Sequence, residues 1–302
     1  MITSVDKEIK KIYYKGSKKS LFVNILLVSL IAVISGCTIG MWILGRDKGT
    51  DLYNIDTNNL YDNVVLIKEE SLSKTPIELG AEKCAALAIY TTNNEPSVQM
   101  VGEGKVVSMG VTQKIKTKTV KQNSKIFYEN VSVSNLVSAT NRFYLENNVI
   151  TRIKGSVKGN TVNWNGGSNT MTVEQYKEIM GVDIAEYICY IISSKTITSN
   201  SEVVLNDDGN YEFTFTLDKV SSVINYVKNM KETGSLGDYP KFNDDISVKI
   251  VMDSNYRILT FSCTENYKVK KGIWVNAVGE LVNTFTYDQS FAIPNKSEPT
   301  TM

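Results

Sequence analysis

The feature that most constrains this chain is an uninterrupted apolar segment near its N-terminus, residues 21–45, LFVNILLVSLIAVISGCTIGMWILG. It contains no aspartate, glutamate, lysine or arginine. At about 1.5 Å per residue, a helix of this length covers roughly 37 Å, which exceeds a hydrocarbon core of about 30 Å. Such a helix has no polar side to turn toward water, so a buried helix of a soluble domain does not explain it. The sequence therefore predicts one transmembrane helix.

The charges that flank this segment predict its orientation. Residues 1–20 form a basic tail in which six lysines outnumber Asp6 and Glu8, whereas Arg46, Asp47 and Lys48 nearly cancel. The positive-inside rule then places the tail in the cytoplasm and the rest of the chain outside the cell. We expect a single-pass protein of the cell membrane with an extracellular C-terminal domain and with membrane lipid as one partner.

A second mode of attachment uses the same segment. The tetrad Ile34-Ser35-Gly36-Cys37 resembles a bacterial lipobox, which implies cleavage and lipid attachment at Cys37. The long basic tail and the apolar residues 38–45 after the cysteine favour an uncleaved helix instead. Both interpretations stay open, and both leave the body tethered outside the cell.

Composition divides the remaining chain into three regions. Residues 46–74 are polar and turn-rich and predict a tether, with the apolar run 64–67 (Val-Val-Leu-Ile) as a first short strand. Residues 75–289 predict an extracytoplasmic α+β domain. Residues 290–302 predict a flexible, solvated tail.

Two capping boxes and one capping residue predict the helices. Thr75-Pro76-Ile77-Glu78 predicts a helix over 76–91, and Thr172-Val173-Glu174-Gln175 predicts a short helix that Gly181 closes. Asp218 is expected to cap a third helix, which runs to about Lys231.

Most of the domain alternates apolar and polar residues with a period of two, which is typical of antiparallel strands joined by short turns. The predicted strands are 99–108, 111–121, 125–134, 138–146, 149–158, 161–164, 196–205, 211–217, 246–252, 257–269 and 274–287.

The order of these elements resembles the LolA-like fold of lipoprotein-carrier proteins. More narrowly, five motifs within residues 75–289 are similar to a group of uncharacterised Gram-positive membrane-anchored proteins. The motifs are Tyr211-Glu212-Phe213-Thr214-Phe215-Thr216-Leu217-Asp218, Met230-Lys231…Gly234, Tyr239-Pro240-Lys241-Phe242, Asp253-Ser254-Asn255-Tyr256-Arg257 and Glu265-Asn266-Tyr267. The resemblance implies an α+β fold: a curved antiparallel sheet, or half-open barrel, with an N-terminal helix and inserted helices, preceded by one transmembrane helix.

The resemblance also implies a candidate ligand site. In LolA-like carriers the concave sheet face and its helices enclose an apolar cavity for acyl chains. Its implied lining here comprises Phe213, Phe215, Phe261 and Phe285. The competing interpretation is that these four side chains fill the core at ordinary packing density.

Catalytic and metal-binding chemistry finds little support in the sequence. The chain has no histidine, which excludes Ser-His-Asp triads, Cys-His dyads and histidine-ligated metals. Cys84, Cys189 and Cys263 lack metal spacing and lie among apolar residues, so we expect buried small hydrophobes, although a disulfide between two of them stays open. Carboxylates make an acid-base pair only where folding brings two together, and the candidates are Glu103, Glu129, Asp183 and Glu265. We expect no enzyme, no metal and no cofactor, and the net charge of +1 argues against nucleic acid.

Two classes of function therefore remain. One is a membrane-anchored extracytoplasmic non-enzymatic binding protein that carries or senses a lipid, a lipoprotein or another apolar ligand. The other is a bitopic scaffold subunit of a cell-envelope, secretion or conjugation complex, with an envelope protein as its partner. The first class predicts a deep, dry cavity between sheet and helices, and the second predicts a filled core with an exposed apolar or strand-edge patch.

Overall fold

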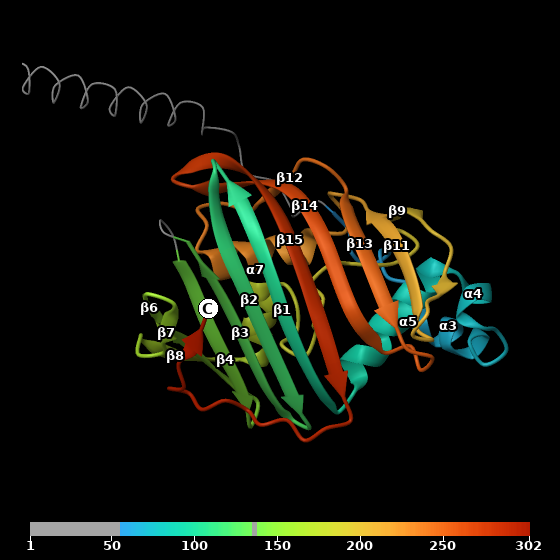
Figure 1. The fold of residues 1–302 in the computed structure, drawn as a ribbon, viewed down its shortest axis with the longest axis horizontal. Helices are drawn as coiled ribbons and strands as arrows, with labels where there is room; N and C mark the ends of the chain where they lie inside the picture. Colours follow the sequence, from blue (N-terminus) through green and yellow to red (C-terminus); the bar gives the residue numbers. More distant parts are fainter. Residues whose placement is uncertain (1–54, 135–137) are drawn as a thin grey trace, which may run out of the picture. The chain divides into compact units, whose positions relative to one another are not determined.

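The computed structural model describes residues 55–134 and 138–302 (Figure 1). Residues 55–134, 138–271 and 275–302 belong to one compact unit, which we call the folded body. The predicted transmembrane helix over 21–45, together with Cys37, lies outside the described residues. None of the helices in the described ranges is long and apolar enough to cross a membrane.

One antiparallel sheet dominates the folded body. Its strands are β1 Ser97–Ser108, β2 Val111–Gln122, β3 Lys125–Val133, β4 Ser138–Glu146, β5 Val149–Lys154, β8 Ser168–Thr172, β9 Ile197–Asn200, β10 Val204–Leu205, β11 Tyr211–Leu217, β12 Lys241–Phe242, β13 Ile246–Met252, β14 Ile258–Lys271 and β15 Ile273–Tyr287. They follow the order β10-β11-β13-β14-β15-β1-β2-β3-β4-β5-β8, with β9 beside β11 and β12 beside β14. The sheet is open, since β10 and β8 end the order and do not pair with each other.

Short turns with left-handed residues make the meander from β1 to β5. Positive φ angles occur at Gly110 between β1 and β2, at Asn123 between β2 and β3, and at Asn147 and Asn148 between β4 and β5. Glycine and asparagine tolerate this conformation better than other residues, so the turn chemistry agrees with the predicted strand breaks. The pairing of β15 with β1, from Val98 opposite Tyr287 to Val107 opposite Val278, then joins the C-terminal strands to this meander.

The described residues form five helices: α3 Val64–Glu70, α4 Pro76–Leu79, α5 Ala81–Asn94, α6 Val173–Met180 and α7 Ile224–Gly234. Side chains of α5, α6 and α7 join buried clusters with strand residues of one sheet face, which we call the inner face; the opposite face is the outer face. In Figure 1 the sheet is seen from the outer face, with α7 behind it.

The predicted helix starts are confirmed, and the first helix is divided. Thr75 and Thr172 both form reciprocal capping boxes, and Gly181 ends α6 in the left-handed conformation. Gly80 separates α4 from α5 at φ 79° and ψ 164°, a region that essentially only glycine adopts.

The strand predicted for residues 64–67 is wrong, because the run lies in helix α3, Val64–Glu70. The side chain of Asn63 accepts a hydrogen bond from the backbone nitrogen of Leu66 at 3.5 Å and so caps the helix. Ile67 packs against Ala86 and Leu87 of α5. A cap and a helical neighbour therefore outweigh the strand preference of the run.

The predicted start of the third helix is also corrected. The Asp218 carboxylate accepts hydrogen bonds from the backbone nitrogens of Val220 (3.1 Å) and Ser221 (2.6 Å), but it stabilises a turn. Helix α7 begins six residues later at Ile224, after Val223.

The C-terminal residues do not form the solvated tail that the sequence predicts. Strand β16, Thr300–Thr301, pairs with β7, Thr161–Asn163, which also pairs with β6, Ser156–Lys158. Phe291, Ile293 and Met302 pack against a buried cluster formed mainly by β2–β5 residues. We call residues 291–302 the C-terminal segment; in Figure 1 it is red and ends beside β7.

Candidate functional site

The structure brings the four predicted cavity residues, Phe213, Phe215, Phe261 and Phe285, into one buried cluster. Each side chain is between 2% and 4% exposed. Tyr187 lies edge-on to the ring of Phe285 with centroids 5.8 Å apart, and the rings of Phe213 and Phe215 stack at 6.1 Å. These rings thus contact other aromatic rings within the core of the inner face.

The three cysteines of the folded body are free thiols. Cys84 and Cys263 are buried as predicted, and Cys189 is partly buried. Burial raises the pKa of each of the three thiols to about 12, so all three stay protonated at neutral pH. The Cys84 thiol donates to the carbonyl oxygen of Pro76 at 3.2 Å, which ties α4 to α5.

Folding separates the predicted candidate carboxylates. Glu129 pairs with Arg142, Glu103 lies 4.0 Å from the Lys116 ammonium, and Asp183 accepts a hydrogen bond from a backbone nitrogen. Glu265 is buried on the inner face, where the Tyr226 hydroxyl donates to its Oε2 at 3.3 Å. Burial raises the pKa of the Glu265 carboxyl to about 8, so it is mostly protonated at neutral pH. No two of these carboxylates form an acid-base pair.

The described ranges hold no group of three or more cysteine, aspartate or glutamate side chains that would suit a metal ion.

Most residues at the β9–β10 edge of the sheet are exposed to solvent. Residues 197–205 follow β11 as an interrupted edge strand, and among the described residues no strand pairs with their outward side. At the interruption, Ser201 donates its backbone N–H to the Thr214 carbonyl at 2.8 Å, and its hydroxyl accepts from the Thr214 nitrogen at 3.0 Å. This interruption shortens the continuous edge, and short edge strands are a common protection against unwanted pairing.

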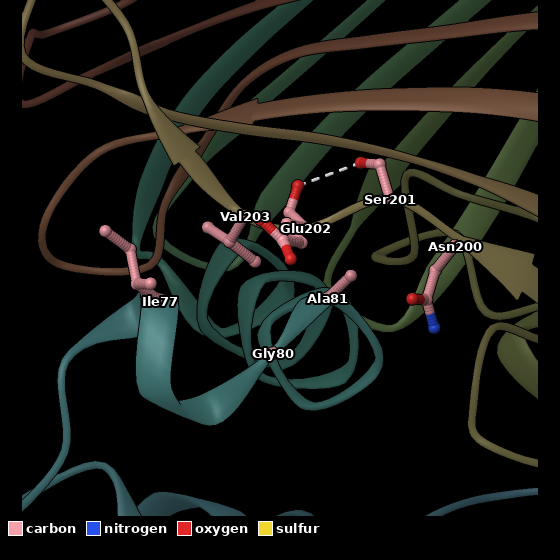
Figure 2. Close-up of a pocket in the computed structure, with 7 residues that line it drawn as sticks. All are labelled: Ile77, Gly80, Ala81, Asn200, Ser201, Glu202 and Val203. Carbon is pink, nitrogen blue, oxygen red and sulfur yellow. Dashed lines mark hydrogen bonds between the residues drawn. The ribbon is translucent and has the colours of Figure 1, made fainter.

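Beside this interruption is a pocket of about 430 Å³ between the edge strand and the junction of α4 with α5 (Figure 2). Its lining comprises Ile77, Gly80, Ala81, Asn200, Ser201, Glu202 and Val203. The Asn200 amide donates to the Glu82 carboxylate at 3.2 Å, which joins the strand to α5. Nothing lies within 4 Å of the place where a Cβ on Gly80 would stand, so glycine leaves the space open.

Exposed apolar side chains occur at the pocket and in the strand residues that follow its lining residue Val203. Ile77 of α4 is 55% exposed, and Val204 and Leu205 of β10 are 48% and 56% exposed. The Asn206 nitrogen donates to the Asn210 carbonyl at 2.8 Å, and Leu205 lies opposite Tyr211. Because hydrogen-bonded and non-bonded pairs alternate in antiparallel strands, the N–H and C=O of Leu205 point away from β11. The edge therefore presents the backbone N–H and C=O of Leu205 to an added strand, and the pocket beside it could receive a side chain of that strand.

The sequence predicts a strand over 196–205 and gives no sign that it is an edge, because edge position depends on strand order. The only local hint is that two apolar residues, Val204 and Leu205, come directly before the turn at residues 206–210.

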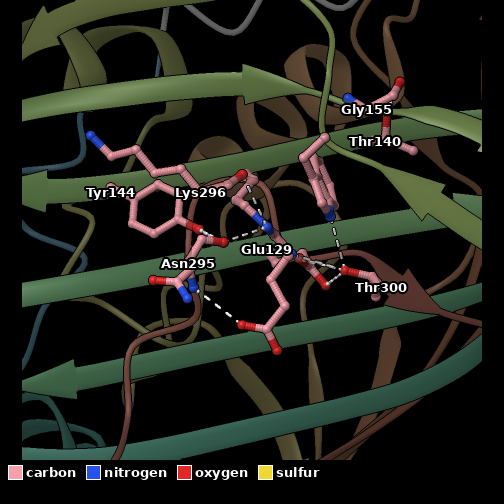
Figure 3. A network of polar contacts seen from close by, with 10 residues as sticks. Glu129, Thr140, Tyr144, Gly155, Asn295, Lys296 and Thr300 are labelled. Carbon is pink, nitrogen blue, oxygen red and sulfur yellow. Dashed lines mark hydrogen bonds and ion pairs between the residues drawn. The ribbon is translucent and has the colours of Figure 1, made fainter.

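A second cluster of polar contacts holds the C-terminal segment (Figure 3). Its centre is the buried ion pair between Arg142 and Glu129, with Thr300 hydrogen-bonded to both. Tyr144 and Arg142 donate to the Asn295 carbonyl, each at 3.1 Å. The polar groups of Arg142, Glu129, Tyr144 and Thr300 all bond other parts of the same chain, so we interpret the cluster as a structural clasp and not as a binding site.

Comparison with known proteins identifies no relative by sequence, since no family model and no curated protein matches the chain. Three solved structures were retrieved by fold. The ywiB protein from Bacillus subtilis is 6% identical, with 64% of this chain and 93% of that chain covered and a TM-score of 0.17. A DUF1329 family protein from Desulfovibrio piger is 9% identical, with 72% and 96% covered and a TM-score of 0.21. A porin-like protein from Bacteroides uniformis is 6% identical, with 64% and 98% covered and a TM-score of 0.21. At such low TM-scores these likenesses carry no argument about the function of this chain.

Proposed function

We propose that this chain is a membrane-anchored, extracytoplasmic, non-enzymatic interaction protein, a bitopic subunit of a cell-envelope complex. In this proposal its folded body binds an extended segment of a partner protein as an added strand at the β9–β10 edge. The observation that carries it is the open edge beside the 430 Å³ pocket. In strand addition, main-chain hydrogen bonds supply affinity and adjacent pockets supply specificity.

The packing of the inner face supports this class over a carrier. The four phenylalanines that a carrier would use to line a cavity are at most 4% exposed and contact neighbouring aromatic rings. Apolar surface is exposed instead at Ile77, Val204 and Leu205, next to the strand edge. A filled core with an exposed strand-edge patch is what an interaction protein requires.

The membrane attachment belongs to the same proposal. In the bitopic form, residues 21–45 would span the bilayer with residues 1–20 in the cytoplasm. If Cys37 instead carries the lipid of a cleaved lipoprotein, the body is still anchored outside the cell, but the protein is not bitopic. Intact-mass analysis of the protein extracted from membranes distinguishes the two, since the first leaves Met1 in place and the second leaves a diacylglyceryl adduct on Cys37.

Site-specific photo-crosslinking in cells that express the full chain tests the strand-edge proposal. A benzophenone amino acid at Val204 is expected to give one discrete heteromeric product. The same amino acid at Val282, a similarly exposed valine on the outer face of β15, is the matched control and should give none.

Leu205→Lys provides the second arm of this test. A lysine at an exposed edge position keeps the backbone donor but discourages strand addition, and it removes an apolar contact. We expect the Val204 product to fall at least tenfold while the amount of folded protein stays unchanged. Equal crosslinking from Val204 and Val282, or a product unaffected by Leu205→Lys, would contradict the proposal.

A lipid or lipoprotein carrier is the second candidate. What favours it is the arrangement of one open antiparallel sheet with α5, α6 and α7 on a single face, which is the layout that the LolA-like resemblance implies. Native mass spectrometry of the full chain released gently from membranes would reveal a stoichiometric lipid in addition to any lipid on Cys37. Such a finding would favour the carrier over the interaction protein.

A further inference from the structure

Helix α3 turns apolar side chains toward solvent, the reverse of an ordinary surface helix. Val65 and Leu66 are 65% and 60% exposed, and Leu72, directly after the helix, is 86% exposed. On a helix, Val65 and Glu69 lie nearly opposite Ile67, the one residue of α3 that is buried, and Leu66 lies to one side of it. We call Val65, Leu66 and Leu72 the α3 apolar patch.

The folded body does not need this patch for its own packing. Ile67 and Val64 already join α3 to Ala86 and Leu87 of α5. Val65, Leu66 and Leu72 are exposed within eight residues of the chain, and exposed apolar side chains grouped in this way generally mark an interaction site.

The chain enters the folded body directly before α3 and is held there. The Ser194 backbone nitrogen donates to the Asp62 carboxylate at 2.8 Å, and the Asn225 amide donates to the Tyr61 hydroxyl at 3.1 Å. The Ser193 hydroxyl donates to the Leu60 carbonyl. Residues 60–62 therefore fix the point at which the body is connected to everything N-terminal to it.

The length of chain before this point limits how far α3 can be from a membrane. The predicted span ends at residue 45, and residues 46–59 are polar and turn-rich. Even fully extended, these 14 residues reach at most about 50 Å. The α3 apolar patch begins three residues after this attachment point, so the chain length keeps it within reach of the bilayer.

We infer that the α3 apolar patch docks on the phospholipid surface to which the chain is anchored, with Val65, Leu66 and Leu72 inserted at the level of the headgroups. The inference rests on the membrane anchor of the proposed function. Residues 56–74 carry two lysines against four carboxylates, so attraction to anionic lipid does not drive the contact. Apolar burial drives it, as in interfacial helices, and the docked body presents a constant side to the membrane.

A lipid-quenching experiment on the full chain in phosphatidylcholine vesicles tests the inference. An environment-sensitive fluorescent amino acid is placed at Leu72 or, as the matched control, at the exposed Val282 on the outer face of the sheet. We expect emission from position 72 to shift to the blue and to be quenched several-fold more strongly by lipid spin-labelled near the headgroup. The quenching should persist in high salt, since screening weakens electrostatic contacts and leaves apolar ones.

The outcomes separate docking from anchoring. Equal, water-like emission at both positions in protein that floats with the vesicles would overturn the docking and leave the anchor intact. A blue shift at position 72 without lipid quenching would show that another protein or a second copy covers the patch, which also overturns the inference. Protein that fails to float with the vesicles would contradict the anchor and the docking together.

Discussion

The two faces of the sheet are covered in different ways. Over β11, β13 and β14 the inner face is filled by apolar side chains from α5 and from residues 187–192. Over β3–β5 the outer face is covered by the C-terminal segment, which is held by hydrogen bonds around the Arg142–Glu129 ion pair as well as by apolar contacts.

This difference predicts which substitutions destabilise each face. Apolar packing is non-directional, so a small loss of volume on the inner face has a limited effect. A buried polar cluster depends on every partner, because one unpaired charge retains its full desolvation penalty. We therefore expect a substitution that leaves a buried polar group unpaired to lower the free energy of unfolding more than one that removes a little apolar volume.

Glu265 is a buried polar side chain within the otherwise apolar packing of the inner face. Its ionisation should change the free energy of unfolding more than any of the substitutions that follow. Its pKa rises from 4.5 to about 8 on folding, so the folded state holds a proton that the unfolded state releases between these values. Stability from this group is complete below pH 4.5 and is lost as the pH rises to about 8. At roughly 1.4 kcal/mol per pKa unit, the loss reaches on the order of 5 kcal/mol.

Glu265→Gln should therefore flatten the fall in unfolding free energy with pH, because its amide does not ionise. Urea unfolding of the full chain in detergent micelles, followed by circular dichroism over this pH range, measures the slope. Glu280→Gln, at an exposed outer-face glutamate paired with Lys105, is the control and should keep the wild-type slope. Identical slopes in both variants would show that burial does not control the titration of Glu265.

Arg142→Met is expected to have the next largest effect, about 4 kcal/mol of destabilisation. It leaves the Glu129 carboxylate, 5% exposed, without its cation, and it removes the donor to the Asn295 and Lys296 carbonyls. Chemical unfolding measures the loss, and limited proteolysis should show earlier cleavage within the C-terminal segment.

The double variant Arg142→Met with Glu129→Leu is the control for this prediction. Replacing both members of a buried ion pair by apolar residues is often close to neutral, so the double variant should recover most of the lost stability. If it is as unstable as Arg142→Met, the penalty comes from the lost packing of Arg142 on the Trp164 ring, whose centroid lies 4.2 Å from its Cζ.

Thr300→Val should destabilise the folded body by about 2 kcal/mol, because the hydroxyl that it removes hydrogen-bonds to several partners. Valine nearly preserves the side-chain volume, so packing should change little. The Thr300 hydroxyl donates to Glu129 at 2.9 Å and accepts from Trp164 Nε1 at 3.0 Å. Thermal unfolding of Thr300→Val beside Thr300→Ser tests the role of the hydroxyl, because serine keeps it. An equal loss of stability in Thr300→Ser would show that the methyl group contributes as much as the hydroxyl.

Ile250→Val should have the smallest effect, about 1 kcal/mol. Ile250 is fully buried on the inner face opposite Phe213 and Phe261, and the change removes one methylene group. Urea unfolding measures it. A loss as large as that of Arg142→Met would remove the contrast between the two faces.

Much of the fold could be predicted from local sequence. The alternation in Ile246–Met252 and Tyr211–Leu217 gives strand bounds that agree with the structure, and the capping boxes at Thr75 and Thr172 mark true helix starts. The strand predicted for residues 64–67 was wrong because a short apolar run is compatible with a helix or a strand. A helix cap and a neighbouring helix decide between them.

The candidate site was much less predictable. The phenylalanines expected to line a cavity were placed correctly on an apolar strand face, but sequence could not say what packs against that face. The pocket beside residues 200–203 joins them to α4 and α5, which lie more than a hundred residues earlier in the chain.

The sequence by itself determined the local elements: the period-two strands, the glycine and asparagine turns, the helix caps and the expectation of an N-terminal membrane anchor. These depend on neighbouring residues within a few positions, where sterics and hydrogen bonding act directly. Tertiary structure alone decided which strand lies at the edge, that the C-terminal segment closes over Arg142, and that Glu265 is buried next to Tyr226. Those outcomes arise from contacts between residues far apart in the chain, and no local pattern encodes the free energy of such contacts.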